Sequence, residues 1–346
     1  MAKPTQRFLF LALGGLVALV LAGGYQAASL RLTALTGIVD AQLAYSIGGS
    51  QAALAPVSVS PQQLATQWVV SPAEAKFLIE QGAVVLDVRD VGVQRQGRLQ
   101  GAIAVQWQAF SETVDPQQGN LLDDDTLLSE KLQAIGISAQ HPVVVVGDPQ
   151  RGWGQEGRVV WMLRTLGHGQ SVMVDGGFAA LKQVGLPLSR AVETVAPAPG
   201  DFMVQRTDQW TLYQDDLRQA IATNRLVILD TRERREFEGA VPYGERQGGH
   251  LPGAIHLHYR ELLDAEGRLR PEAERLALLQ ERGIPQDAAI LAYCTGGVRS
   301  AWLTVVLVDM GFDAKNYPGS MWEWSAGSRD RYPLVLPATE NPDQKS

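Results

Sequence analysis

The chain has 346 residues, enough for two domains of ordinary size, and its 45% hydrophobic and 19% charged residues are typical of globular rather than disordered proteins. Its formal net charge is -7 and its pI is about 5.3. Because a nucleic-acid-binding surface has to be basic, this balance argues against nucleic acid as a partner.

The first residues have the pattern of an export signal. Lys3 and Arg7 precede an apolar run over residues 8–22. We interpret residues 1–27 as a signal peptide or membrane anchor. The alternative is a buried core helix, but its apolar residues would form one stripe, whereas those of this run cover every face. The chain is therefore expected on the periplasmic side of the inner membrane. It would be soluble if the segment is cleaved and otherwise anchored, with no other contact with the membrane.

Two linkers and a tail divide the remaining chain. Residues 28–56 are rich in Ala, Ser, Gly and Gln, which suits a tether. Residues 191–200 end in Ala-Pro-Ala-Pro-Gly, which fits neither a helix nor a central strand. This predicts modules at residues 57–190 and 201–337, followed by a tail at 338–346.

The two modules repeat one order of predicted elements. Each has an apolar strand ending in an acid and an arginine, a glycine turn into a short strand, a second apolar strand, and then a loop and an amphipathic helix. These are residues 84–89, 99–103, 143–146 and 159–166 in the first module, and residues 227–232, 251–255, 289–293 and 301–309 in the second. Such alternation predicts α/β modules, each with a mainly parallel sheet flanked by helices.

Cys294 is the only cysteine, so no internal disulfide can form. It follows the predicted strand 289–293, at the edge where parallel sheets collect functional residues. The thiol is either a small buried hydrophobic side chain or a working nucleophile.

The residues after Cys294 favour the working nucleophile. They read Thr295-Gly296-Gly297-Val298-Arg299-Ser300. Two consecutive glycines allow positive φ and turn N–H groups inward as a nest for an anion. A helix starting at Arg299 or Ser300 adds its positive end, and Thr295 or Ser300 offers a hydroxyl. These surroundings stabilise a thiolate, and they would hold a persulfide in the same way.

At these residues the sequence resembles the rhodanese family in its tandem two-domain form. The resemblance covers residues 57–337 and lies in Asp230-x-Arg232, Gly249-His250-Leu251-Pro252-Gly253-Ala254, the loop of residues 294–299, and Tyr317-Pro318-Gly319-Ser320-Met321-Trp322-Glu323-Trp324. The first module, with Arg158-Val159-Val160-Trp161-Met162-Leu163-Arg164, Gly167-His168 and Asp175-Gly176-Gly177-Phe178, looks like the family's non-catalytic half.

The resemblance implies a sulfurtransferase. Cys294 would take sulfane sulfur from a small anionic, thiosulfate-like donor as a persulfide and pass it to cyanide or a thiol, including a protein thiol. Residues 295–300 would bind the substrate, with their backbone N–H groups and Arg299 stabilising the thiolate. The first module has Gly147-Asp148-Pro149 where the second has Cys294, so it would be a structural half that closes one wall of the site.

Three other functions stay open. Phosphatases and arsenate reductases of related fold carry a longer Cys-x5-Arg loop, whereas Cys294 and Arg299 are spaced Cys-x4-Arg. A membrane-tethered carrier or sensor of sulfane sulfur would load Cys294 without turnover. A structural scaffold would leave the thiol unreactive.

Four residues are expected to support the site. Asp230 and Arg232 are interpreted as a structural ion pair, with direct substrate contact as the alternative. His250 is interpreted as an anchor for its loop, with a general base as the alternative. Glu236 stands where related enzymes carry a second donor-binding arginine. An acid near the mouth would repel a dianionic donor unless a neighbouring arginine, Arg234 or Arg235, compensates.

The sequence predicts no bound metal ion or cofactor. No histidines or carboxylates have metal-ligand spacing, and no phosphate-binding glycine pattern occurs, so neither a metal nor another cofactor is predicted. Trp322 and Trp324 are expected in the core or the pocket wall. A monomer is expected, because the two modules can cover each other's apolar faces.

Overall fold

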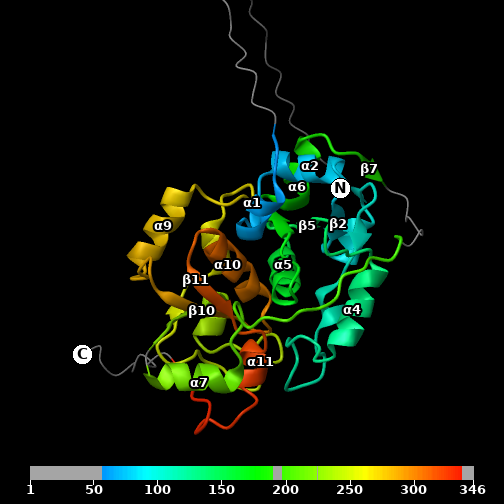
Figure 1. The fold of residues 1–346 in the computed structure, drawn as a ribbon. Helices are drawn as coiled ribbons and strands as arrows, with labels where there is room; N and C mark the ends of the chain where they lie inside the picture. Colours follow the sequence, from blue (N-terminus) through cyan, green and yellow to red (C-terminus); the bar gives the residue numbers. More distant parts are fainter. Residues whose placement is uncertain (1–56, 190–196, 224, 337–346) are drawn as a thin grey trace, which may run out of the picture. The chain divides into compact units, whose positions relative to one another are not determined.

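The computed structural model describes residues 57–189, 197–223 and 225–336 (Figure 1). The predicted signal or anchor, the linker at 28–56, the tail at 338–346 and most of the linker at 191–200 lie outside the described residues. Among the described helices, none is long and apolar enough to cross a membrane. The described residues of both modules belong to one compact unit.

The first module alternates short strands with helices, as its sequence predicts. Its strands are β1 (Val69–Val70), β2 (Val84–Asp87), β3 (Arg98–Leu99), β4 (Ile103–Ala104), β5 (Val143–Val146), β6 (Ser171–Val174) and β7 (Leu188–Ser189). Its helices are α1 (Pro61–Thr66), α2 (Pro72–Glu80), α3 (Val91–Gln94), η1 (Trp107–Phe110), α4 (Asp125–Ala134), α5 (Gln155–Thr165) and α6 (Gly177–Gln183).

The second module repeats this alternation. Its strands are β8 (Val227–Asp230), β9 (Ile255–His256), β10 (Ala289–Tyr293) and β11 (Asp313–Asn316). Its helices are α7 (Gln214–Thr223), α8 (Arg234–Phe237), η2 (Tyr259–Leu262), α9 (Glu272–Glu281), α10 (Val298–Asp309) and α11 (Ser320–Trp324).

Corresponding strands stand in the same order in the two main sheets, although the first sheet has one more strand. The first runs β1-β6-β5-β2-β4 and the second β11-β10-β8-β9, and every pairing within them is parallel. A parallel bridge between Thr211 and Asn316 stands at the edge of the second sheet, where β1 stands in the first. The predicted repeat and the parallel α/β modules are therefore confirmed.

Each sheet separates two cores, because side chains alternate along its strands. In β5, Val143 and Val145 face a core shared by both modules, and Val144 and Val146 face a core of the first module alone. In β10, the even-numbered side chains face the shared core and the odd-numbered ones a core of the second module.

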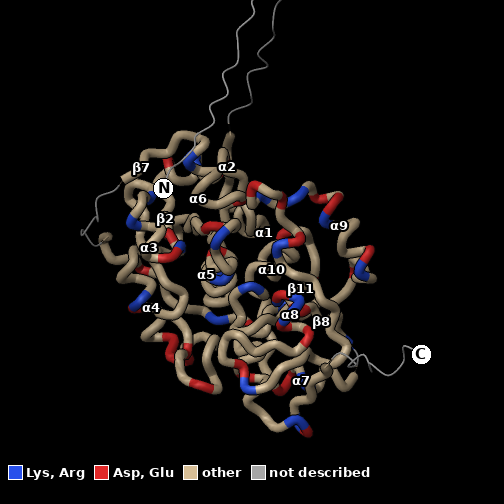
Figure 2. Tube along the Cα trace, turned by 180° about the vertical axis from the view of Figure 1, so that it is seen from behind, with Lys and Arg blue, Asp and Glu red and all other residues tan. Residues whose placement is uncertain are grey.

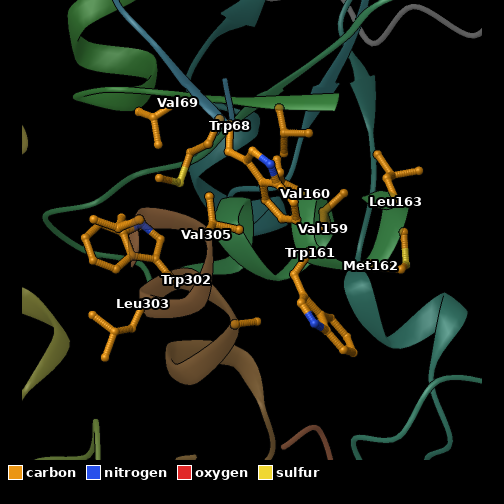
Figure 3. Packing of buried hydrophobic residues seen from close by; sticks show 14 of the residues in the cluster. Trp68, Val69, Val159, Val160, Trp161, Met162, Leu163, Trp302, Leu303 and Val305 are labelled. Atoms are coloured by element: carbon orange, nitrogen blue, oxygen red, sulfur yellow. The ribbon is translucent and has the colours of Figure 1, made fainter. Parts of the chain in front are cut away.

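Helices α5 and α10 pack against each other inside the shared core (Figure 3). A Cβ atom at Gly157 would lie 2.3 Å from the Trp302 Cα, so only glycine permits this close approach. Both helices start earlier than predicted, at Gln155 and Val298, because a left-handed glycine caps each of them. The apolar face that each module leaves open is thus buried against the other module.

Positions of Lys and Arg and positions of Asp and Glu are interspersed along the chain trace in Figure 2. Several pair at the surface, as Arg331 does with Asp215 and Arg282 with Glu261. Pairs of this kind contribute little to stability because water screens them.

Candidate active site

Cys294 lies directly after β10, in the turn that leads into α10. Its side chain is buried, with 1% of its surface exposed. The backbone N–H of Cys294 donates to Ser320 Oγ at 3.0 Å, and the first turn of α11 donates from Met321 and Trp322 to the carbonyls of Cys294 and Thr295. The loop is therefore fixed by β10, which precedes it, and by hydrogen bonds to the first turn of α11.

Several hydrogen-bond donors point at the Cys294 sulfur. Burial alone would raise the pKa of the thiol, but Arg299, the Ser300 hydroxyl and the backbone N–H groups of Ser300 and Gly296 outweigh it and leave the pKa below its ordinary value. Ser300 Oγ lies 3.6 Å from Sγ. The Thr295 hydroxyl, the other hydroxyl considered from the sequence, bonds instead to Glu236 and Glu245.

The two glycines of the loop serve different purposes. Gly297 adopts φ 75°, the left-handed conformation expected of it, and caps α10. Gly296 does not adopt positive φ, so the prediction for this residue was wrong. Its role is steric, because a Cβ atom there would lie 2.0 Å from the Trp322 ring.

Glu236 is not a free acid at the mouth, and this sequence expectation also was wrong. Its carboxylate is fully buried and accepts from both terminal nitrogens of Arg299 at 2.7 Å. Burial favours the protonated acid, but the Arg299 guanidinium outweighs it and holds the pKa of Glu236 below its ordinary value. Arg234 and Arg235 do not compensate for it, since both are largely exposed and pair with surface glutamates.

The other supporting residues form a buried frame behind the loop. Arg232 donates to Asp230 from Nε and Nη2 at 2.9 and 2.7 Å, and both side chains are fully buried, as the interpretation of a structural ion pair requires. The His250 ring stacks on Phe237 and lies 2.9 Å from the carbonyl oxygen of that residue. Within the described part of the chain, none of these three lines the cavity that contains Cys294.

A cavity of about 290 Å³ opens beside Cys294, and both modules line it. The second module contributes residues 294–296, Val298 and Arg299 together with Tyr243 and Trp322, whereas Trp324 is buried in the core. The first module contributes Asp90, Trp107, Gln108, Trp153 and Gln155. It therefore closes one wall, as predicted. Trp107, Trp153 and Tyr243 were not predicted as site residues, because no local sequence pattern around them indicates a site.

A buried arginine of the first module also reaches the loop. Arg158, in α5, donates to the Gly297 carbonyl at 3.2 Å and to Ser111 Oγ and the Gly119 carbonyl. No ion pair joins it to an acid among the described residues. Burial lowers the pKa of Arg158 to about 9, and the nearby Cys294 opposes this shift. The guanidinium thus stays charged at neutral pH, with the thiolate as its nearby counter-charge.

The corresponding loop of the first module has no nucleophile. Gly147 follows β5, and the carboxylate of Glu156 fills the space where its side chain would stand. In the described residues no group of three or more His, Cys, Asp or Glu side chains could hold a metal ion.

Comparison with known proteins defines the family. A family model described as the rhodanese-like domain matches residues 71–183 and 213–327. Thiosulfate sulfurtransferase of Azotobacter vinelandii is 27% identical over 270 residues, which cover 78% of this chain and 97% of that protein. The sulfur carrier protein TtuD of Thermus thermophilus is 26% identical over 276 residues, covering 75% of this chain and 92% of that protein.

The solved structures agree on the fold. SseA from Escherichia coli, described as a 3-mercaptopyruvate sulfotransferase, superposes with a TM-score of 0.64 at 24% identity, covering 74% of this chain and 99% of that one. The chain therefore belongs to the rhodanese-like family and carries two copies of its domain. Within that family it is a sulfurtransferase-type enzyme.

Proposed function

We propose that the protein transfers sulfane sulfur through a persulfide on Cys294. The observation that carries the proposal is a buried thiol whose pKa lies below its ordinary value, because hydrogen-bond donors of the loop and a cation surround Sγ. A lowered pKa makes more of the thiol the nucleophilic thiolate at a given pH, and the same donors would stabilise a persulfide anion.

The cycle has two steps with one donor and one acceptor. The Cys294 thiolate attacks the outer sulfur of a small anionic donor such as thiosulfate. The sulfur–sulfur bond of the donor breaks, and sulfite leaves with the electron pair. Cyanide or a thiol then attacks the outer sulfur of the persulfide and leaves the Cys294 thiolate free. The loop of residues 295–300 binds the substrate through its backbone N–H groups in both steps, because the Arg299 guanidinium is already paired with Glu236.

Intact mass of the body from residue 57 onward tests this cycle. Incubation with thiosulfate should add one sulfur atom, about 32 Da, and later addition of cyanide should remove it. The Cys294→Ser variant should keep its circular dichroism spectrum and show no gain. Sulfur transfer by that variant would disprove the mechanism. If thiosulfate adds no mass, 3-mercaptopyruvate is the next donor, and failure of both would leave the carrier and scaffold functions.

A sulfur carrier is the second candidate, because one relative bears that name. A carrier would gain the same mass from a donor, yet the persulfide would resist cyanide and small thiols and pass only to a protein thiol. Loss of mass on adding cyanide therefore separates the enzyme from the carrier.

We further propose that residues 1–27 direct export to the periplasmic side of the inner membrane and that the protein is a monomer. Cell fractionation, with the N-terminal sequence of the recovered protein, would test export and cleavage. Light scattering of the soluble body would test the monomer.

A further inference from the structure

We infer that the cavity beside Cys294 selects small organic thiols with a cationic body as sulfur acceptors, an inference that rests on the proposed persulfide cycle. It goes beyond the cycle by naming the kind of acceptor. The inference stands on the rings and charges around the cavity.

Aromatic rings from both modules surround the cavity. Trp107 and Trp153 come from the first module, and Tyr243 and Trp322 from the second. Trp153 and Tyr243 meet edge to face at 5.5 Å, and Trp322 Nε1 donates to the Tyr243 carbonyl at 2.8 Å, so these rings are fixed in place. Trp153 is nevertheless 40% exposed at the mouth, and its surface is open to a ligand.

The one basic residue among the described lining residues is not free to hold an anion. Only 4% of the Arg299 side chain is exposed to solvent, and both of its terminal nitrogens donate to Glu236. Its guanidinium carbon lies 5.4 Å from the Trp153 ring centre and 5.8 Å from that of Tyr243. Glu236 neutralises the charge of Arg299 and accepts hydrogen bonds from both of its terminal nitrogens. Arg299 therefore has no free terminal N–H pair and no net positive charge with which to attract a dianion.

Acids remain without a matching cation at the same place. Asp90 lines the cavity, and Glu245 lies behind the Thr295 hydroxyl, to which it is bonded at 3.2 Å. Neither carboxylate forms an ion pair with a described residue. Arg235 lies 6.0 Å from the centre of the Tyr243 ring, but Glu233 pairs with it. Arg158 offsets the charge of a persulfide on Cys294, so Asp90 and Glu245 are the charges around the cavity that no cation matches.

These features favour a cationic acceptor. Aromatic faces attract a cation, and carboxylates add to the attraction, whereas an anionic thiol would be repelled. In the transfer step, the acceptor thiolate forms a bond to the outer persulfide sulfur. The bond between that sulfur and Sγ breaks, and its electron pair returns to Cys294 as the thiolate. No oxidant is needed, because the acceptor leaves as its own persulfide.

Three thiols of similar size and different charge test the inference. Cysteamine is cationic, 2-mercaptoethanol is neutral and 3-mercaptopropionate is anionic. Cys294 is first loaded with inorganic polysulfide, and unloading by each thiol is followed by intact mass. The same thiols reacting with a small-molecule persulfide correct for their intrinsic reactivity. We expect cysteamine to unload Cys294 about 3- to 30-fold faster than 3-mercaptopropionate after this correction, with a smaller ratio at high salt.

Variants of Trp153 separate ring recognition from general electrostatics. Trp153→Leu should lower the preference for cysteamine, and Trp153→Phe should keep most of it. Tyr213→Leu, which removes a partly exposed ring outside the cavity, should leave it unchanged. Equal corrected rates for the cationic and anionic thiols, or a ratio that Trp153→Leu does not change, would overturn the inference. Failure of Cys294 to gain sulfur from polysulfide would overturn the persulfide cycle itself, and the mass before thiol addition shows which of the two has failed.

Discussion

Cys294 is a thiol that burial by itself would keep protonated, because a charged sulfur loses its hydration there. Arg299, the Ser300 hydroxyl and two backbone N–H groups replace that hydration and reverse the shift. Glu236 fixes the Arg299 guanidinium, so little reorganisation of this group is needed when the charge on the sulfur changes.

The Ser300 hydroxyl is the donor that a single substitution removes most cleanly. In Ser300→Ala we expect the pH midpoint of Cys294 alkylation by iodoacetamide to rise by about one unit, since a hydrogen bond to a charged group is lost. Initial alkylation rates between about pH 5 and pH 10, a range that covers the usual pKa values of cysteine thiols, measure this midpoint. Thr304→Ala is the control, because the Thr304 hydroxyl bonds the Ser300 carbonyl and not the sulfur. An unchanged midpoint in Ser300→Ala would show that this hydroxyl does not stabilise the thiolate.

Among the elements, α5 links the fold to the site. Consecutive residues of this helix have different tasks: Gly157 lets α10 approach, Glu156 fills the space beside Gly147, and Arg158 reaches the catalytic loop. Buried polar side chains on a helix lower the stability of the fold unless neighbouring elements supply hydrogen-bond partners for them.

Gly157→Ala should destabilise the protein, although alanine is the better helix former. The added methyl group would meet the Trp302 backbone of α10, and overpacking of this kind costs about 1–3 kcal/mol. Urea unfolding measures the change. Gly169→Ala is the matched control, since a Cβ atom there meets nothing within 4 Å and no left-handed φ is involved. Equal stability of the two variants would mean that α5 and α10 separate easily.

Glu156 should make stability depend on pH. Burial raises its pKa to about 7, and interactions with Trp302 and with its own backbone only partly offset this shift. A raised acid pKa means that the folded protein holds the proton more tightly, so the penalty is absent below about pH 4.5, grows through the window up to about pH 7 and is complete above it.

Glu156→Gln removes that penalty. Its gain in the free energy of unfolding, relative to the wild type, should be larger at pH 8 than at pH 4.5 by about 3 kcal/mol. Denaturant unfolding at the two pH values gives this difference directly. A gain that is the same at both values would contradict the buried, protonated acid.

At the scale of the whole molecule, the two modules share one core and one site. The module without a nucleophile supplies Trp107 and Trp153 to the cavity and the unpaired cation of Arg158 to the loop. It therefore forms part of the candidate site and is not only a support for it.

Arg158→Met should raise the pKa of Cys294 by about one unit, because a buried positive charge near the thiolate is lost. The pH dependence of thiolate absorbance measures the shift. Arg164→Met is the control, as Arg164 is buried in the same helix but donates to the carbonyls of Leu64, Ala65 and Gln67, away from the site. Arg164→Met should lower stability without moving the thiol pKa, and the same pKa in both variants would exclude a role of Arg158 in the charge of Cys294.

Strand and helix patterns, the repeat of two modules and the position of Cys294 were predictable from the sequence, because backbone hydrogen bonding imposes local periods on the side chains. The left-handed Gly297 and the Ser300 hydroxyl were equally predictable, since both act within a single turn. Only the tertiary structure decided that Glu236 would neutralise Arg299, that Gly296 would make room for Trp322, and that Arg158 and Trp153 would join the site. These contacts connect residues far apart in the chain, and their outcome depends on how two sheets and two helices pack, for which no local pattern exists.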